Sequence, residues 1–283
     1  MEQRNHPTHR EQVVRPYLTL VLSLALLGHS AGAQVADAGV SKTFLQRRDL
    51  VTAGIALGAT ALLSVWDDDI ALASQQTRYQ STSLHNFALN VSKVNETTLT
   101  LAGIATYGIA RLSKAPTVAD IALHATESVV LASVASQLIR GPLGRSRPFV
   151  TKDKDQYDFK PFGGFTADTA FNYRAFPSIH TSSGMAVATV LTMETHRRHP
   201  GATPFVAPIL FAAGILPGLV RIQLDQHWAS DIAAGAFMGV FAGYKVVSYS
   251  HGHPDNRFDK FLLRASVMPD ANGRMMLMVS PEF

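Results

Sequence analysis

The chain carries Arg140-Gly-Pro-Leu-Gly-Arg-Ser-Arg147-Pro148, then Pro177-Ser178-Ile179-His180, then Arg221-Ile-Gln-Leu-Asp-Gln-His227-Trp-Ala-Ser-Asp231. These three segments concentrate arginine, serine, histidine and aspartate, side chains that can hold a phosphate-like oxyanion and attack it without a metal. Each segment alone is a weak signal, because Arg-Pro is a common turn dipeptide and Pro-Ser a common helix start. With residue frequencies on the order of 5% each, chance assembly of all three has a probability below roughly one in ten thousand. We therefore expect the segments to meet in one site.

The last segment supplies a histidine and a carboxylate at helical spacing. His227 and Asp231 are four residues apart, so they share one face of a helix that begins near His227. A carboxylate there can accept the proton of one imidazole nitrogen and leave the other nitrogen free as a nucleophile. Arg221, at the end of the preceding expected helix, can hold phosphate oxygens bidentately.

The other two segments add an anion site and more positive charge. Ser178 and His180 precede an expected helix, whose first N–H groups and serine hydroxyl can bind an anion. His180 is placed to protonate a departing alkoxide. Arg140 and Arg147 bring two permanent charges that offset the negative charge of a transition state.

Composition narrows the class of protein. The chain has 283 residues, of which 47% are hydrophobic and 16% charged, against about 25% charged in an average soluble protein. Mean hydropathy is +0.10, between the values of a helix-rich soluble core and a membrane-embedded bundle. The absence of cysteine excludes disulfides, thiolate catalysis and cysteine-based metal sites. The net charge of +4 comes without a basic stripe or a nucleic-acid motif, so we expect no nucleic-acid partner.

Residues 1–33 have the pattern of a secretory signal peptide. The segment begins with three arginines, Arg4, Arg10 and Arg15. An apolar run follows at residues 17–27, and residues 31–33 have the small-x-small pattern of a cleavage site. We therefore expect an exported protein of the bacterial periplasm, soluble or membrane-associated; an uncleaved membrane anchor is the alternative. A catalytic domain over residues 34–255 and a tail over residues 256–283 would follow.

Apolar and amphipathic runs predict an all-α fold with about six core helices. The expected helices cover residues 50–66, 97–112, 118–139, 182–195, 205–220 and 229–247. Residues 149–176 form a long loop, of a length at which loops are often functional lids. Asn272-Gly273 predicts the turn of a short C-terminal β-hairpin.

Two observations argue against these helices spanning a membrane. A spanning helix needs about 20 mostly apolar residues, and only residues 201–220 are uncharged over that length, with three prolines. If residues 1–33 are cleaved and six helices span, the basic helix ends at 42–48, 111–114 and 197–198 would lie outside, against the positive-inside rule. We therefore expect a soluble or peripherally attached domain, with an integral membrane protein as the alternative.

The expected helix 118–139 carries a polar face. Asp120, His124 and Glu127 stand at i, i+4 and i+7, and so lie on one side of it. They form either a network behind the site or the polar stripe of a partly buried helix, and we favour the stripe. The basic run 196–199 follows the helix 182–195, where cations complement the helix dipole, and we interpret it as a solvated cap.

The three segments resemble the signature of the type 2 phosphatidic acid phosphatase (PAP2) superfamily, which includes lipid phosphate phosphatases, bacterial class A acid phosphatases and vanadium haloperoxidases. Its pattern is Lys-x6-Arg-Pro, Pro-Ser-Gly-His and Ser-Arg-x5-His-x3-Asp. The resemblance covers roughly residues 50–250 and includes the six-helix layout, which implies a PAP2-type helical bundle. The matching residues are Arg147, Pro148, Pro177, Ser178, His180, Arg221, His227 and Asp231.

Three residues depart from that pattern. Arg140 replaces lysine and keeps the charge, though a guanidinium needs more room. Val220 replaces serine and removes a supporting hydroxyl. Ile179 replaces the glycine that, in the family, lets a backbone amide approach the phosphate, and a β-branched residue resists a positive φ and crowds the anion. Either this loop has an ordinary conformation, or the site is slower, or it has another ligand.

The resemblance implies a metal-independent phosphatase that acts on phosphomonoesters or on lipid phosphates and diphosphates. It implies that His227 attacks phosphorus to form a phosphohistidine, that Asp231 orients His227, and that His180 protonates the leaving group and then activates water. It implies no cofactor, with vanadate as a ligand or inhibitor. The phosphate-binding residues it implies are Arg140, Arg147, Ser178, Ile179 and Arg221.

Two other functions stay open, and so does the substrate class. A vanadate-dependent haloperoxidase would use the same residues, because vanadate resembles the phosphoryl transition state. A weakened phosphate- or lipid-binding protein of the same fold is favoured by Ile179. The partner is a lipid head group or a phosphorylated small molecule. Exposed apolar surface near the loop 149–176 would favour lipids, and a polar funnel would favour small phosphomonoesters.

Overall fold

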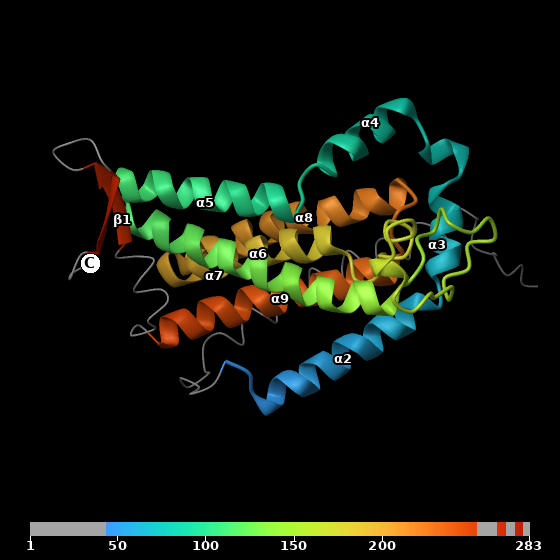
Figure 1. Cartoon of the computed structure of the whole chain (residues 1–283), viewed down its shortest axis with the longest axis horizontal. Helices are drawn as coiled ribbons and strands as arrows, with labels where there is room; N and C mark the ends of the chain where they lie inside the picture. The colour runs from blue at the N-terminus through green and yellow to red at the C-terminus, as the bar shows by residue number, and fades with distance from the viewer. Residues whose placement is uncertain (1–43, 254–264, 270–274, 280–283) are drawn as a thin grey trace, which may run out of the picture.

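The computed structural model describes residues 44–253, 265–269 and 275–279. Long helices run side by side and form an elongated bundle (Figure 1). The signal peptide expected at residues 1–33 lies outside the described residues.

Four long helices make up the centre of the bundle. They are α6 (Pro116–Leu143), α7 (Ile179–Arg198), α8 (Thr203–Gln223) and α9 (Ala229–Gly252). Helix α7 packs against each of the other three. A Cβ added at Gly184 of α7 would lie 2.2 Å from the carbonyl oxygen of Gly214 on α8, so only a glycine allows this backbone approach.

Four more helices complete the described bundle. They are α2 (Arg47–Ser64), α3 (Asp67–Ser74), α4 (Thr82–Val91) and α5 (Glu96–Leu112), and short 3₁₀ turns precede α4 and α8 at η1 (Thr77–Tyr79) and η3 (Pro200–Ala202). Helix α2 packs on α9, and α5 packs on α6. Helix α5 begins after Asn95, whose side chain accepts the N–H groups of Thr97 and Thr98 and so caps the helix.

The six core helices predicted from the sequence are all present, with shifted ends. Helix α6 continues through Pro142 to Leu143, and α7 begins at Ile179 rather than at residue 182. Between them lies the long loop, in which the described elements are one short 3₁₀ turn, η2 (Gly163–Phe165), and an isolated bridge between Arg145 and Phe159. The prediction of a long loop at 149–176 is therefore confirmed.

Two short strands follow the bundle. Strands β1 (Ala265–Pro269) and β2 (Met275–Val279) pair antiparallel, with Ala265 opposite Val279. Residues 270–274, where Asn272-Gly273 predicts the turn, lie outside the described residues, so the C-terminal hairpin stays a prediction.

The outer surface of the bundle is apolar. Among the described residues, four helical stretches are long and apolar enough to cross a membrane, namely Arg47–Ser74, Pro116–Leu143, Pro200–Gln223 and Ala229–Gly252. The large exposed apolar side chains include Leu50, Ile55, Leu62, Leu101, Ile109, Leu112, Phe205 and Ile209 on α2, α5 and α8. Such a surface is typical of helices that face lipid tails.

The fold therefore supports a membrane protein and corrects the preference for a soluble or peripheral domain. From the sequence, only residues 201–220 were expected to be uncharged over a spanning length, yet α6 also qualifies because it turns its polar face inward. His124, in the middle of that face, is only 1% exposed. A polar stripe that packs against α7 and α9 does not prevent the opposite side of the helix from facing lipid.

Candidate active site

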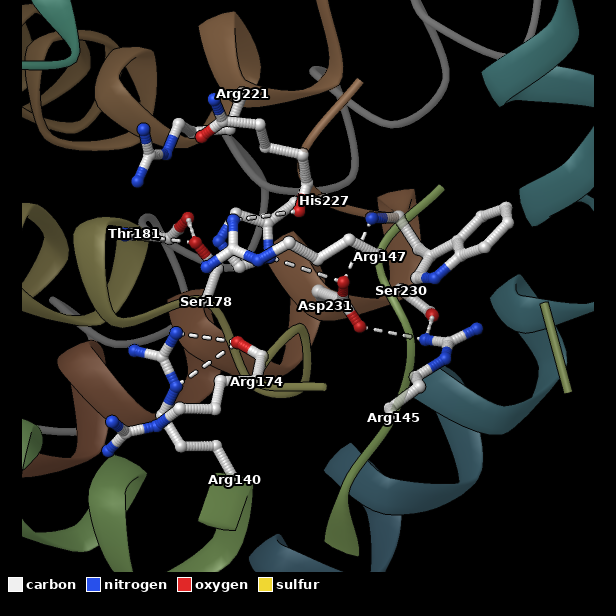
Figure 2. Close-up of polar contacts among 12 residues, drawn as sticks. Arg140, Arg145, Arg147, Arg174, Ser178, Thr181, Arg221, His227, Ser230 and Asp231 are labelled. Carbon is white, nitrogen blue, oxygen red and sulfur yellow. Dashed lines mark hydrogen bonds and ion pairs between the residues drawn. The ribbon is translucent and has the colours of Figure 1, made fainter. Parts of the chain in front are cut away.

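The three predicted segments meet at one end of the bundle, where the long loop and α3 also lie (Figures 1 and 2). This meeting follows from the topology, because α6 and α8 end there while α7 and α9 begin there. Arg140 comes from the last turn of α6 and Arg221 from that of α8. Ser178 caps α7, and Asp231 lies in the first turn of α9.

A buried histidine and aspartate form the centre of the site. The Nδ1 atom of His227 lies 3.3 Å from Oδ2 of Asp231, and both side chains are fully buried. An ionised carboxylate can only accept, so Nδ1 carries the proton and Nε2 keeps its lone pair. The buried Nε2 atom has no hydrogen-bond partner within the described structure. His227 therefore presents a free nucleophilic nitrogen.

His227 is held in its neutral form. Burial, followed by the charges of Arg147, Arg221 and Arg140, holds the pKa of His227 well below its usual value. An imidazolium is disfavoured both by the loss of hydration and by the three neighbouring cations. The neutral ring needed for nucleophilic attack is thus favoured relative to that of a free histidine.

Asp231 is fixed in place by three further contacts. Its Oδ2 atom accepts the backbone N–H of Trp228 at 2.9 Å, and its Oδ1 atom accepts Nη1 of Arg145 at 2.8 Å. Its own backbone carbonyl accepts the N–H of Ser178 at 3.0 Å. Asp231 therefore links His227 to the start of α7.

Arg145 connects Asp231 to a second buried carboxylate that was not predicted from the sequence. Its Nη2 atom lies 2.8 Å from Oδ2 of Asp67, the first residue of α3. Asp67 also accepts the backbone N–H of Ser230 at 2.8 Å and the hydroxyl of the same residue. Arg145 stands inside the first quoted segment, so the sequence offered a signal for it. Nothing local pointed to Asp67, which tertiary packing brings to the site.

Three arginines surround His227 without a counter-ion. In the described part of the chain, no carboxylate oxygen lies within 4.0 Å of the guanidinium nitrogens of Arg140, Arg147 or Arg221. Arg140 donates from Nε and Nη2 to the carbonyl of Arg174, at 3.2 and 2.5 Å. Burial and the charges of Arg140 and Arg221 lower the pKa of Arg147 to about 9. This excess of buried positive charge is suited to a multiply charged anion.

Backbone carbonyls and an aromatic ring hold Arg147. Its Nε atom donates to the carbonyl of Phe171 at 2.6 Å, and its Nη1 atom donates to the carbonyl of Gln226 at 3.2 Å. The guanidinium carbon lies 4.4 Å from the centre of the Phe171 ring. Both neutral acceptors orient the guanidinium while leaving its charge uncompensated.

The start of α7 provides the remaining side chains. Ser178 is fully buried, and its hydroxyl oxygen accepts from the Thr181 hydroxyl at 2.9 Å. Nη2 of Arg221 lies 3.5 Å from Nδ1 of His180. Because arginine has no acceptor atom, this contact requires Nδ1 to accept and leaves the His180 proton on Nε2. The structure therefore brings together every residue that the sequence assigned to catalysis or phosphate binding.

Ile179 has an ordinary helical conformation. It is the first residue of α7, and it is not among the non-glycine residues with positive φ. Of the three outcomes expected for this departure from the glycine pattern, the ordinary loop conformation is confirmed. The side chain is 2% exposed and belongs to the buried part of the protein.

We predict that Ile179→Gly destabilises the protein without raising its phosphate release. The substitution removes a buried aliphatic side chain, and large-to-small changes of this kind cost about 2–5 kcal/mol. It gives no conformational benefit, because the backbone is already helical. Thermal unfolding and phosphate release per folded molecule would check both parts. A tenfold or larger rise in turnover would instead show that the isoleucine crowds the anion.

The polar face of α6 does not take part in this site. Asp120 and His124 lie 20 and 16 residues before Arg140 in the same helix, which corresponds to about 30 and 24 Å along its axis. The alternative that they form a network behind the site is therefore wrong. The favoured interpretation of these residues as a polar stripe is correct, and the stripe is more deeply buried than expected.

Fold and site together describe a bundle of helices long and apolar enough to cross a membrane, with a buried, histidine-centred cluster of positive charge at one end. Residues 121–254 match the family model described as the PAP2 superfamily. This stretch carries all three predicted segments.

Individual relatives match over shorter stretches. The chain is 27% identical over 124 residues to a lipid A 1-phosphatase of Rhizobium etli, covering 44% of this chain and 48% of that protein. It is 34% identical over 83 residues to a lipid A 1-phosphatase of Porphyromonas gingivalis, covering 29% of this chain and 17% of that protein. The chain thus spans about half or less of the length of these curated relatives.

One solved structure is similar at a lower level. It is a transmembrane PAP2 type phosphatidylglycerolphosphate phosphatase from Bacillus subtilis, with 17% sequence identity and a TM-score of 0.47. The match covers 85% of this chain and 99% of that chain.

Proposed function

We propose that the protein is a lipid phosphate phosphatase that works through a phosphohistidine intermediate. The observation that carries this proposal is a neutral, buried His227 with a free Nε2 atom, placed among three arginines that have no counter-ion within the described residues. A bound phosphate group supplies the counter-ion for these arginines. The lipid A 1-phosphatases among the relatives support the same reaction class.

In the proposed mechanism, Nε2 of His227 attacks phosphorus. A bond forms between nitrogen and phosphorus, and the bond between phosphorus and the ester oxygen breaks. Asp231, which accepts from Nδ1, stabilises the positive charge that develops on the ring. Water then attacks the phosphohistidine and releases inorganic phosphate, which restores His227.

His180 serves as the proton donor and then as the proton acceptor in this scheme. Its ring lies beside Arg221, whose charge disfavours a protonated ring when no anion is bound. A bound phosphate dianion offsets the charges of Arg221 and Arg140 and so favours the protonated ring. His180 protonates the leaving oxygen in the first step and accepts a proton from water in the second.

The oxyanion is held by Arg140, Arg147, Arg221 and Ser178, with the first N–H groups of α7 nearby. These arginines provide the charge stabilisation that a metal provides in other phosphatases, so we propose a metal-independent reaction in this site. Vanadate, which adopts the shape of the phosphoryl transition state, would occupy the same residues and inhibit.

Exposed aromatic side chains of the long loop favour a lipid substrate. Six of them have exposures from 39% to 65%: Phe149, Tyr157, Phe159, Phe162, Phe165 and Phe171. Aromatic side chains of this kind are common where a protein meets the head-group region of a membrane. Exposed apolar surface near this loop is the feature expected for lipid phosphates, whereas small phosphomonoesters would favour a polar funnel.

Charge placement favours a site that faces away from the cytoplasm. Arg47, Arg111 and Arg198 lie at helix ends opposite the site. The positive-inside rule assigns such ends to the cytoplasm. The same charge pattern argued against spanning when the first helix was assumed to start outside. It fits a spanning bundle in which α2, the first described helix, begins on the cytoplasmic side. We propose that the site opens to the periplasm.

A phosphate-release panel tests the substrate class. We expect the full chain in detergent micelles to release phosphate from a lipid phosphate with a KM at least tenfold lower than for p-nitrophenyl phosphate. The double variant Tyr157→Ser/Phe162→Ser should raise the lipid KM at least tenfold, because burying one aromatic side chain against lipid contributes about 1.5–3 kcal/mol and tenfold corresponds to about 1.4 kcal/mol.

The soluble substrate is the internal control for that panel. Its KM should change less than threefold in the double variant, since p-nitrophenyl phosphate has no acyl chains to contact the loop. Equal loss for both substrates would contradict a lipid-contacting role for these aromatic residues. Absence of phosphate release from every substrate, with vanadate-dependent bromination in its place, would contradict the phosphatase itself.

A further inference from the structure

A second cluster of chemically reactive side chains lies at the opposite end of the bundle from the active site. Four residues from three helices form it: Asp120 and His124 from α6, Glu194 from α7 and His251 from α9. One potential ligand atom from each residue lies within 4.8 Å of the other three. Two imidazoles and two carboxylates at this spacing are a ligand set for a transition-metal ion.

The two histidines converge on one carboxylate oxygen. Nε2 of His251 lies 2.7 Å from Oε1 of Glu194, and Nδ1 of His124 lies 3.4 Å from the same oxygen. The two imidazole rings meet edge to face, with centroids 5.2 Å apart. In a tetrahedral zinc site, ligand atoms are about 3.3 Å apart, given zinc–ligand distances of about 2.0–2.2 Å. The 2.7 Å between Nε2 of His251 and Oε1 of Glu194 is therefore close to the separation that two ligands of one zinc ion require.

An unsatisfied nitrogen points into this cluster. His124 is 1% exposed, and its Nε2 atom has no hydrogen-bond partner within the described residues. That atom lies 3.6 Å from Oδ1 of Asp120, a separation too long for a hydrogen bond. Buried polar nitrogens are rarely left without a partner, and a metal ion between Nε2 and Oδ1 would satisfy it.

Arg198 contacts the cluster through the second oxygen of each carboxylate. Its Nη1 atom donates to Oε2 of Glu194, and its Nη2 atom lies 3.5 Å from Oδ2 of Asp120. The histidines lie against the other two oxygens, Oε1 and Oδ1. Carboxylates that bind metals are commonly oriented by such an outer hydrogen-bond partner. Arg198 is therefore compatible with a metal in the centre, and the prediction that the run 196–199 is only a solvated cap is incomplete.

We propose that Asp120, His124, Glu194 and His251 bind one divalent transition-metal ion, with zinc the best match to two nitrogen and two oxygen ligands. With both histidines neutral, the two carboxylates offset the charge of the ion, and the partly exposed Arg198 leaves one positive charge at the edge of the cluster. The ion would join α6, α7 and α9 at the end of the bundle away from catalysis. Its role is to stabilise the fold, and it is independent of the proposed phosphatase reaction.

Zinc binding to the full chain tests the proposal. We expect chelator-treated protein in detergent micelles to bind one equivalent of Zn²⁺ in equilibrium dialysis with elemental analysis, and to unfold at a higher temperature when zinc is present. His251→Ala should weaken zinc binding at least tenfold and remove the thermal shift. If that variant does not fold, Asp120→Asn, which alters a partly exposed side chain, should weaken binding in the same way.

Two control variants show whether zinc binds at these four residues. His253→Ala should bind zinc like the unmodified protein, because His253 contacts the carbonyl of Tyr249 instead of the cluster. His227→Ala should also bind zinc normally, because His227 lies at the other end of the bundle. A negative result for the phosphatase proposal therefore does not affect the metal-site proposal. Binding of less than one tenth of an equivalent, or equal binding by the protein with and without His251→Ala, would show that the cluster is only a hydrogen-bonded network.

Discussion

Replacing His227 with alanine should abolish phosphate release, with kcat reduced by a thousandfold or more. Removal of a nucleophile that acts together with its supporting groups has effects on the order of 10³–10⁶ in rate. The structure gives the reason, since His227 alone among the described site residues combines a free ring nitrogen with a carboxylate behind it. Release of p-nitrophenol from p-nitrophenyl phosphate, followed at saturating substrate, would measure the loss.

His199→Ala provides a matched control for this substitution. His199 is an exposed histidine at the end of α7, away from the site. Its replacement should leave both activity and thermal stability within error. Phosphate release by His227→Ala at the unmodified rate would rule out His227 as the nucleophile and with it the phosphohistidine intermediate.

The site could be predicted from sequence because its residues stand in short, ordered segments. Ser178 and His180 lie within one helix start, and His227 and Asp231 lie at helical spacing. Local rules of capping and periodicity therefore bring each pair together before any tertiary packing is known. The six core helices were predicted for the same reason, since apolar runs of this length leave few other local structures.

Other features depend on packing between distant segments. Asp67 reaches Arg145 across 78 residues of sequence, and nothing near Asp67 indicates a partner. His124, Glu194 and His251 likewise come from three helices, so the sequence revealed only the stripe on α6. The sequence did not show that the bundle faces lipid, because the mean hydropathy of α6 combines an apolar lipid-facing side with a buried polar side. The direction in which His124 points can be known only from the packed structure.

The second large effect is expected at Arg145. Arg145→Met should lower the free energy of unfolding by about 3–5 kcal/mol, the cost of leaving a buried charge without its partner. Asp67 and Asp231 are both fully buried and each lies 2.8 Å from the guanidinium. The control Arg197→Met, which changes an exposed arginine at the opposite end of the bundle, should have little effect. Thermal or denaturant unfolding in detergent micelles would measure both.

Arg145 should also affect catalysis through its hold on Asp231, as a positioning residue. Arg145→Lys keeps one positive charge, but it replaces the two nitrogens that bind Asp231 and Ser230 (Nη1) and Asp67 (Nη2) with a single ammonium nitrogen. We therefore expect Arg145→Lys to fold, to lose about tenfold or more in kcat, and to keep a KM within threefold of the unmodified value, because the three arginines proposed to hold the phosphate are untouched. A rise in KM with unchanged kcat would show instead that Arg145 contacts the substrate. Unchanged values of both would show that Asp231 is held in place by Trp228 and the backbone alone.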